Sequence, residues 1–172
     1  FTQVKKYLCT YPSDINCVID GGFLSMLSRE PYKYDNWIMT PHVGEAAKLL
    51  SSKPSVVEAN RMDAAIELQS QYGGIIVLKG PSTIVVTKSD RYVCGHGNQA
   101  MGTAGMGDCL AGTVLSLVTL AKKDDKVSSV LFATGIHSMA ADMISNDIGS
   151  IGLLASDVII KINKLLNKIE VK

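Results

Sequence analysis

The sequence contains no uninterrupted apolar run near the roughly 18 residues that a membrane-spanning helix needs. Its first residues also lack the basic-then-apolar layout of a secretory signal. Neither sign of charge is in excess, because 17 Lys and Arg residues face 16 Asp and Glu residues and leave a net charge of +1. We therefore expect a cytoplasmic protein that binds neither nucleic acid nor a membrane surface.

Cysteine and histidine are few and dispersed. No pair of cysteines has the spacing of a zinc site or a redox motif, and the three histidines do not cluster. This pattern favours a reduced compartment, and we name no metal ligand. Cys109 follows Asp108 at an expected helix start, where a thiol pKa can fall, but we interpret Cys109 as a packing residue. His96 and His137 are interpreted as structural, the latter in the core.

Internal repeats, low-complexity segments and linkers are also absent, and 172 residues with 47% apolar content suit one domain. Apolar runs that end in polar or glycine-rich loops predict buried strands, which alternate with amphipathic helical patterns. The pattern is typical of an α/β fold with a mainly parallel sheet. Strands are expected over residues 17–20 and 75–78, and residues 37–42 are expected to form a strand followed by a polar loop. A hairpin is expected over 84–86 and 91–94, and helices over 1–10, 23–27, 44–50, 55–72, 107–121, 127–145 and 153–169.

The glycine-rich stretch 97–112 is the most informative segment, because it leads directly into a helical pattern. The first turn of a helix has backbone N–H groups without partners and carries the positive end of the helix dipole, so it suits a phosphate. Asp108 lies where this helix is expected to begin. From spacing alone, Asp108 either caps the helix or acts as a base beside a bound phosphate.

Two further polar residues lie where predicted strands end. His42 falls at a strand-to-helix junction, where ligand-binding groups gather in open α/β sheets. Lys79 follows the strand 75–78 and precedes a run of small residues. Taken alone, His42 is either a structural loop histidine or a ligand contact, and Lys79 is either a solvated turn residue or a site residue.

Four motifs in series resemble one known family. Residues 40–50 (TPHVGEAAKLL) resemble the pattern TPHPGEAARLL, and residues 77–83 resemble VLKGxxT. Residues 97–112 resemble GNxxMxxGGMGDxLxG, and residues 152–157 resemble GxLATD. On these motifs the chain is identified as a member of the ADP/ATP-dependent NAD(P)H-hydrate dehydratases in the ribokinase-like superfamily. The resemblance implies a three-layer α/β/α fold.

The resemblance also implies an activity and a set of site residues. Members of the family restore hydrated NADH or NADPH by phosphorylating the hydrate from ADP or ATP, with Mg²⁺ on the phosphates, and then eliminating phosphate. Asp108 would be the catalytic base and would also contact the hydrate. The other expected hydrate contacts are His42, Val43, Gly44 and Glu45. The expected nucleotide-binding residues are Lys79, Gly80, Pro81, Ser82, Thr83, Asn98, Gly102, Thr103, Ala104, Gly105, Met106 and Gly107.

The chain departs from the family pattern in two places. Gly21 and Gly22 stand where the family usually has an Ala-Asp pair, so one acid near the expected site is lost. The strands and the glycine-rich loop that open the family's domain have no counterpart before residue 1. We therefore expect residues 1–172 to be the carboxyl-terminal part of the domain, with the amino-terminal portion in the same polypeptide or a second chain. Family members commonly form homo-oligomers, which we expect here.

Two other functions remain open. A small-molecule kinase on the same fold, such as one that acts on a vitamin precursor alcohol, uses the same pairing of a glycine-rich loop with an aspartate. A nucleotide-binding module without catalysis is the second alternative, because part of the family's domain has no counterpart here.

Overall fold

The structure is a computed structural model that describes residues 2–10, 15–122 and 125–168. The chain forms two compact units. The first contains the residues up to Gly80 together with Ile84–Tyr92, and the second contains Pro81–Thr83 and the residues from Val93 onward. Each unit has its own hydrophobic core.

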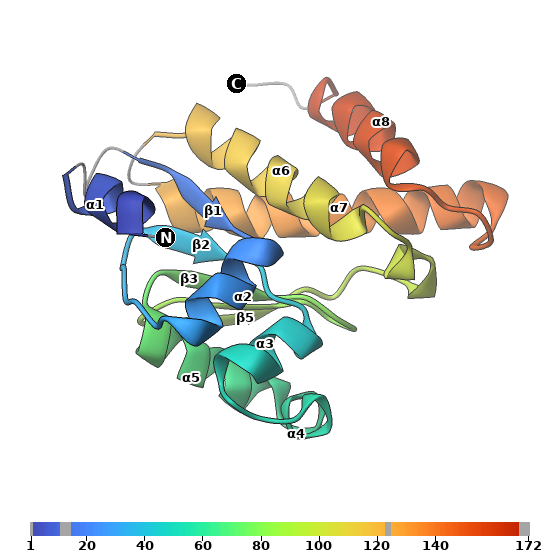
Figure 1. The fold of residues 1–172 in the computed structure, drawn as a ribbon. Coiled ribbons are helices and arrows are strands. Elements are labelled where there is room, and N and C mark those ends of the chain that lie inside the picture. The colour runs from blue at the N-terminus through green and yellow to red at the C-terminus, as the bar shows by residue number, and fades with distance from the viewer. Residues whose placement is uncertain (1, 11–14, 123–124, 169–172) are drawn as a thin grey trace. The chain divides into compact units, whose positions relative to one another are not determined.

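A five-stranded mixed sheet is the centre of the first unit (Figure 1). The first three strands are parallel to one another, and the fourth is antiparallel to the third. This arrangement confirms the predicted mainly parallel sheet followed by a hairpin. In chain order and in sheet order the strands are β1 (Cys17–Ile19), β2 (Trp37–Met39), β3 (Ile75–Leu78), β4 (Ile84–Val86) and β5 (Arg91–Val93).

The helices of the first unit pack on one another and on the sheet, with α5 against β3 and β4. The pattern over residues 55–72 predicts one helix, and this prediction is wrong, because Asn60 takes φ −138° and ψ 55° and divides it. The Asn60 N–H and carbonyl still bond to Val57 and Ala64, so the break leaves neither group without a partner. The helices are α1 (Thr2–Thr10), α2 (Gly22–Arg29), α3 (Val43–Leu49), α4 (Pro54–Ala59) and α5 (Arg61–Tyr72).

Aromatic side chains close the core of the first unit. Trp37 is fully buried beside the ring edges of Tyr32 and Tyr34, and its indole N–H donates to the carbonyl of Tyr72 at 3.1 Å. The Tyr72 hydroxyl in turn donates to the carbonyl of Leu49 at 2.8 Å, so both buried polar groups have partners. These bonds hold α3 and the end of α5 in place relative to β2.

The second unit is helical, with α6 packed against α7 and α7 against α8. Its core includes Met106, Cys109, Ile136, Ala140 and Val158. The predicted helices in this region are confirmed with shifted ends, while residues 1 and 169, at the limits of two predicted helices, lie outside the described residues. The elements are the 3₁₀ helix η1 (Gln99–Gly102), α6 (Met106–Leu120), α7 (Lys126–Ile148) and α8 (Ala155–Leu166).

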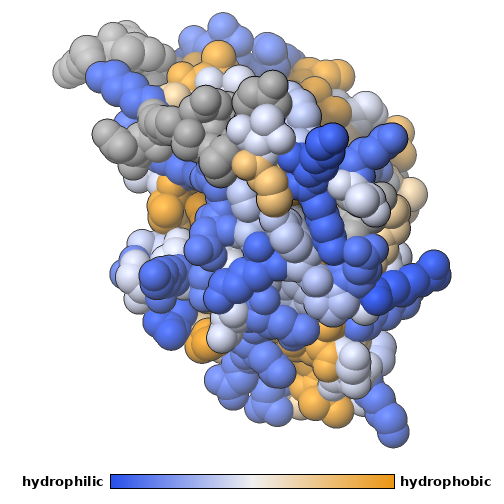
Figure 2. Space-filling model, turned by 60° about the vertical axis from the view of Figure 1, so that its left-hand side comes forward, coloured by the Kyte–Doolittle hydropathy of each residue, from blue (hydrophilic) through white to orange (hydrophobic). Residues whose placement is uncertain are grey.

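Helix α7 is long and apolar enough to cross a membrane by length and composition, at 23 residues and a mean hydropathy of 1.3. The sequence pattern did not single it out, because polar residues interrupt its apolar run. Half of its most apolar window is buried inside the protein, as in the core helix of a globular domain. On the face drawn in Figure 2, hydrophilic residues predominate and apolar residues appear in separate spots.

Candidate functional site

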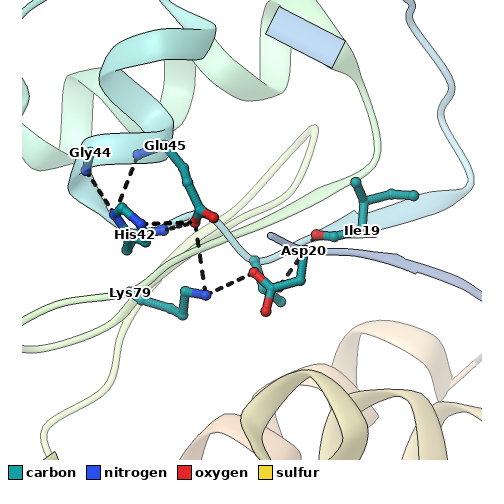
Figure 3. Close-up of polar contacts among 7 residues, drawn as sticks. Ile19, Asp20, His42, Gly44, Glu45 and Lys79 are labelled. Carbon is teal, nitrogen blue, oxygen red and sulfur yellow. Dashed lines mark hydrogen bonds and ion pairs between the residues drawn. The ribbon is translucent and has the colours of Figure 1, made fainter. Parts of the chain in front are cut away.

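The parallel strands of the first unit place several polar side chains at one edge of the sheet. Asp20 follows β1, His42 follows β2 and Lys79 follows β3, so all three come from the carboxyl ends of adjacent parallel strands. This is the edge where open α/β sheets bind ligands. In Figure 3, Lys79 lies between Asp20 and Glu45, with His42 beside Glu45.

Lys79 is paired rather than solvated. Its ammonium nitrogen donates to Oδ1 of Asp20 at 2.8 Å and lies 3.9 Å from Oε2 of Glu45. The side chains of Lys79 and Asp20 are each 17% exposed, so little water competes for their charges. This geometry rules out the alternative that Lys79 is a solvated residue in a turn. Asp20, which sequence reasoning noted only as a strand end, is thereby part of the site.

His42 begins helix α3 through a reciprocal capping box. Its Nδ1 accepts from the N–H groups of Gly44 at 2.9 Å and Glu45 at 3.3 Å, and Oε2 of Glu45 accepts from the His42 N–H at 2.8 Å. Because Nδ1 is an acceptor, the neutral ring carries its proton on Nε2, which lies 3.6 Å from Glu45 Oε2. Glu45 thus supplies a charge at the helix start, its predicted contact with the hydrate stays a prediction, and 60% of the His42 side chain is exposed.

Gly80 allows a side chain from α5 to reach the end of β3. The Arg61 guanidinium donates from Nη2 to the carbonyl of Leu78 at 3.4 Å, and a Cβ on Gly80 would lie 2.8 Å from that nitrogen. Gly80 also has φ +147°, a conformation that residues with side chains rarely adopt. Beyond it, Ser82 has φ +53°, a value that is uncommon for residues other than glycine. Ser82 lies in the turn that is predicted to bind the nucleotide.

The glycine-rich loop of the second unit forms the amino-terminal end of α6. Gly105 is the N-cap in the left-handed conformation, at φ +81° and ψ −9°. Of the backbone amides of residues 104–107, only that of Met106 has an acceptor in the described part of the chain, the Thr103 carbonyl at 3.4 Å. The remaining N–H groups are available to an anion.

Asp108 lies in the first turn of α6 and is exposed. No side chain caps this helix, and no described residue donates to or pairs with the Asp108 carboxylate. The capping alternative therefore has no support in the geometry. A free carboxylate next to unfilled amides is the arrangement that a general base beside a bound phosphate requires. Its catalytic role remains a prediction.

Asn98 is committed to contacts within the second unit. Its side-chain oxygen accepts from the Ala100 N–H at 2.9 Å and the Ser145 hydroxyl at 3.2 Å, and its amide donates to Oδ1 of Asp142 at 2.8 Å. Sequence reasoning missed Asp142. A polar stripe at positions 138, 142 and 145 of an otherwise apolar helix was the signal that could have found it.

Asp142 carries a pKa below its ordinary value. Partial burial alone would raise this pKa, but hydrogen bonds from the Gly97 N–H, the Asn98 amide and His96 favour the ionised form more strongly. His96 Nδ1 lies 3.5 Å from Oδ2 of Asp142. His96, which precedes the glycine-rich loop, is thus tied to α7, in keeping with its interpretation as a structural residue.

Two buried side chains lie close to the start of α6. His137 on α7 is 2% exposed, and burial lowers its pKa to about 4 although a hydrogen bond with the Met106 backbone opposes this. Its Nε2 has no partner among the described residues. Burial raises the pKa of Cys109, which confirms the packing role and excludes the activated thiol.

The structure places the predicted residues in two groups. His42, Val43, Gly44, Glu45, Lys79 and Gly80 belong to the first unit, and Pro81–Thr83, Asn98 and Gly102–Asp108 belong to the second. Within the described ranges, no three His, Cys, Asp or Glu side chains are grouped to hold a metal ion. The individual binding roles stay predictions.

Comparison with known proteins covers nearly the whole chain. A family model described as NAD(P)H-hydrate dehydratase matches residues 3–164. The bifunctional NAD(P)H-hydrate repair enzyme of Coxiella burnetii is 39% identical over 156 residues, which are 90% of this chain and 32% of that protein. The chain thus spans about a third of that relative's length.

Solved structures agree. The ADP/ATP-dependent NAD(P)H-hydrate dehydratase of Bacillus subtilis, crystallised with ATP and Mg²⁺, matches with a TM-score of 0.81 and 25% identity over 91% of this chain and 57% of its own. A ribokinase-like protein from Enterococcus faecalis has a TM-score of 0.79 at 21% identity over 96% of this chain and 57% of its own, which shows the fold alone. These matches confirm the predicted ribokinase-like three-layer α/β/α class. The chain belongs to the NAD(P)H-hydrate dehydratase family.

Proposed function

We propose that the protein containing this chain dehydrates hydrated NADH or NADPH to the reduced dinucleotide, using ADP or ATP. One observation carries the proposal: the Asp108 carboxylate in the first turn of α6 is exposed, pairs with no described residue, and lies next to the amides of Ala104, Gly105 and Gly107, which have no acceptor within the described ranges. The family membership and the relatives' names support the same activity.

The chemistry follows from the leaving group. Hydroxide leaves poorly at neutral pH, and phosphorylation of the hydrate's hydroxyl converts it into a better leaving group. Asp108 takes the hydroxyl proton as the oxygen attacks the terminal phosphorus, and the bond from phosphorus to the nucleotide's bridging oxygen breaks. Phosphate then leaves with the electrons of the C–O bond, a neighbouring ring carbon loses a proton, and the ring double bond is restored.

The binding roles divide between the two groups of residues. The N–H groups of Ala104, Gly105 and Gly107 hold the transferring phosphate, and Asp108 in the first turn of α6 takes the proton. His42 and its capping box present the exposed imidazole edge to the hydrate. Lys79–Thr83 approach the nucleotide. Mg²⁺, when bound, would neutralise phosphate charge. Lys79 engages Asp20 and Glu45, the carboxylates nearest the sheet edge, so phosphate oxygens would be the main ligands of the Mg²⁺ ion.

The chain is proposed to be the carboxyl-terminal part of a longer domain. It spans 57% of the B. subtilis dehydratase and 32% of the bifunctional relative, which supports a further amino-terminal portion. We also propose a cytoplasmic homo-oligomer without nucleic-acid or membrane partners, in line with a net charge of +1.

An absorbance assay tests the proposed activity. The full-length protein is mixed with hydrated NADH or NADPH and either ADP or ATP, and the absorbance of reduced nicotinamide is followed. We expect recovery that depends on the nucleotide. A phosphorylated product without this recovery would identify a small-molecule kinase, and ADP binding without any turnover would identify a non-catalytic module.

A further inference from the structure

Asp142 on α7 joins this helix to the segment that leads into the glycine-rich loop. Its Oδ2 accepts from the Gly97 N–H at 2.9 Å, and its Oδ1 accepts from the Asn98 amide at 2.8 Å. Residues 95–105 are exposed or half-buried, and of these Ala100 and Met101 pack against the core of the second unit, so polar contacts supplement limited apolar packing here. Gly97 has φ +114°, a conformation that residues with side chains rarely adopt, and a Cβ there would lie 3.2 Å from Sδ of Met101.

Asn98 extends the same network into the 3₁₀ helix η1. Its side-chain oxygen caps η1 by accepting from the Ala100 N–H and also accepts from the Ser145 hydroxyl of α7. Both lone pairs of this oxygen are used, and the amide faces Asp142. The Asp142 clamp, defined as Asp142, Ser145, Asn98 and the amides of Gly97 and Ala100, therefore fastens the entry to the glycine-rich loop onto α7.

We propose that Asp142 is a positioning residue for nucleotide binding: it acts through Asn98 and Gly97 to hold the loop whose amides receive the phosphate. The proposal rests on the proposed function and replaces the expectation that Asn98 touches the nucleotide. The clamp fixes residues 97–100, η1 continues from them to Gly102, and α6 begins four residues later. Charge-assisted bonds to the carboxylate suit this task because they are stronger than neutral ones.

Exchanging the Asp142 and Asn98 side chains tests whether the hydrogen bonds between them matter, as opposed to the loss of either side chain alone. In Asp142→Asn, an NH₂ group faces either the Gly97 N–H or the Asn98 amide, so two donors meet. In Asn98→Asp, two carboxylates face each other. The double variant restores the four bonds of the network: the new amide at position 142 accepts from the Gly97 N–H and donates to the new carboxylate at position 98, which still accepts from the Ala100 N–H and the Ser145 hydroxyl.

The full-length protein is compared in these four forms by ADP calorimetry and by amide hydrogen exchange at Gly97 and Ala100. We expect each single variant to weaken ADP binding about tenfold and to lose protection at both amides. The double variant should return to within about threefold of wild type and regain protection. Asp147→Asn is the matched control, since Asp147 lies on the same helix and its exposed carboxylate pairs, among the described residues, with Lys161.

The proposal is overturned if Asp142→Asn leaves ADP affinity and amide protection unchanged, or if the double variant is no better than the single ones. If either single variant fails to fold, the double variant decides alone: near wild-type ADP affinity and amide protection support the proposal, and their loss overturns it. A wild-type protein that binds no ADP would contradict the proposed function instead. In that case, hydrogen exchange at the Gly97 and Ala100 amides would still show whether the Asp142 clamp holds this segment.

Discussion

His137 is neutral in the folded protein over most of the physiological range, because burial lowers its pKa from 6.5 to about 4. An unfolded chain binds this proton below about pH 6.5. Between pH 6.5 and 4 the unfolded state therefore holds more protons, and the free energy of unfolding falls as the pH falls. At its steepest this loss is about 1.4 kcal/mol per pH unit.

We predict that His137→Gln removes this part of the pH dependence, because Gln stays neutral. Denaturant unfolding at pH values from 7 to 4.5 measures it. Asp142 does not obscure the effect: its pKa is lowered, so it stabilises the fold above its unfolded value near pH 4 and this stability is lost only at lower pH. An unchanged slope in the Gln variant would show that His137 is not the group responsible.

A second prediction at the scale of single residues concerns the Lys79–Asp20 ion pair. Lys79→Met leaves the largely buried Asp20 carboxylate without its cation, and we expect a loss of about 2 kcal/mol in unfolding free energy. The double variant Asp20→Asn/Lys79→Met should be more stable than Lys79→Met alone, because no unpaired charge remains. Thermal or denaturant unfolding of the three proteins gives the answer, and additive losses would argue against the pairing.

Residue types and spacing predicted much of the candidate site. The positions of His42, Lys79 and Asp108 at element ends followed from the alternation of apolar runs and loops. The partners of these residues did not, because Asp20 lies 59 residues from Lys79 and Asp142 lies 44 residues from Asn98. Such pairs depend on tertiary packing, which periodicity along one segment does not report.

At the scale of elements, α6 offers a matched pair of glycines. Gly105 is the N-cap at φ +81°, and Gly112 lies inside the helix with open space around its Cβ position. We predict that Gly105→Ala destabilises by about 1 kcal/mol through the left-handed conformation. Gly112→Ala should instead stabilise by about 0.5 to 1 kcal/mol, since Ala favours a helix interior.

Unfolding curves of the two α6 variants measure the predicted loss of stability in one and the predicted gain in the other, on the same helix. A stabilising Gly105→Ala would mean that the loop does not need the left-handed residue. ADP calorimetry on the same proteins adds a functional readout, because only Gly105 belongs to the loop that receives the phosphate. Affinity should fall for the Gly105 variant and remain for the Gly112 variant.

Element boundaries were predicted less well than element types. The division of residues 55–72 at Asn60 was missed, because the apolar stripe of the two helices continues across the break. The start of α3 was predicted closely, because the residues of its capping box are consecutive in sequence. Local chemistry thus fixes a helix start where its partners are local, and distant packing decides the rest.

At the scale of the whole molecule, β1 is the outermost strand of the described sheet on its side. An unpaired edge of a hydrophobic strand is a site for association, which proteins usually cover. Together with the chain's share of its relatives, this supports an amino-terminal portion that adds strands beside β1. We predict that the purified native protein has an intact or assembled mass above 18.4 kDa.

Native mass spectrometry tests the mass prediction directly. A protein whose native mass equals that of residues 1–172 alone, and which remains monomeric and stable, would contradict it. The fold class itself could be predicted from the alternation of strands and helices and from four family motifs.

The proposed dehydration depends on Asp108 as the base in phosphoryl transfer. The most direct measurement is the recovery of reduced nicotinamide absorbance by Asp108→Asn in the full-length protein, with ADP affinity measured alongside. We predict that turnover falls by roughly 100-fold or more, while ADP affinity and unfolding stability stay near wild type, because the side chain makes no described contact. Near-normal turnover in this variant, or a loss of folding in place of turnover, would contradict the account.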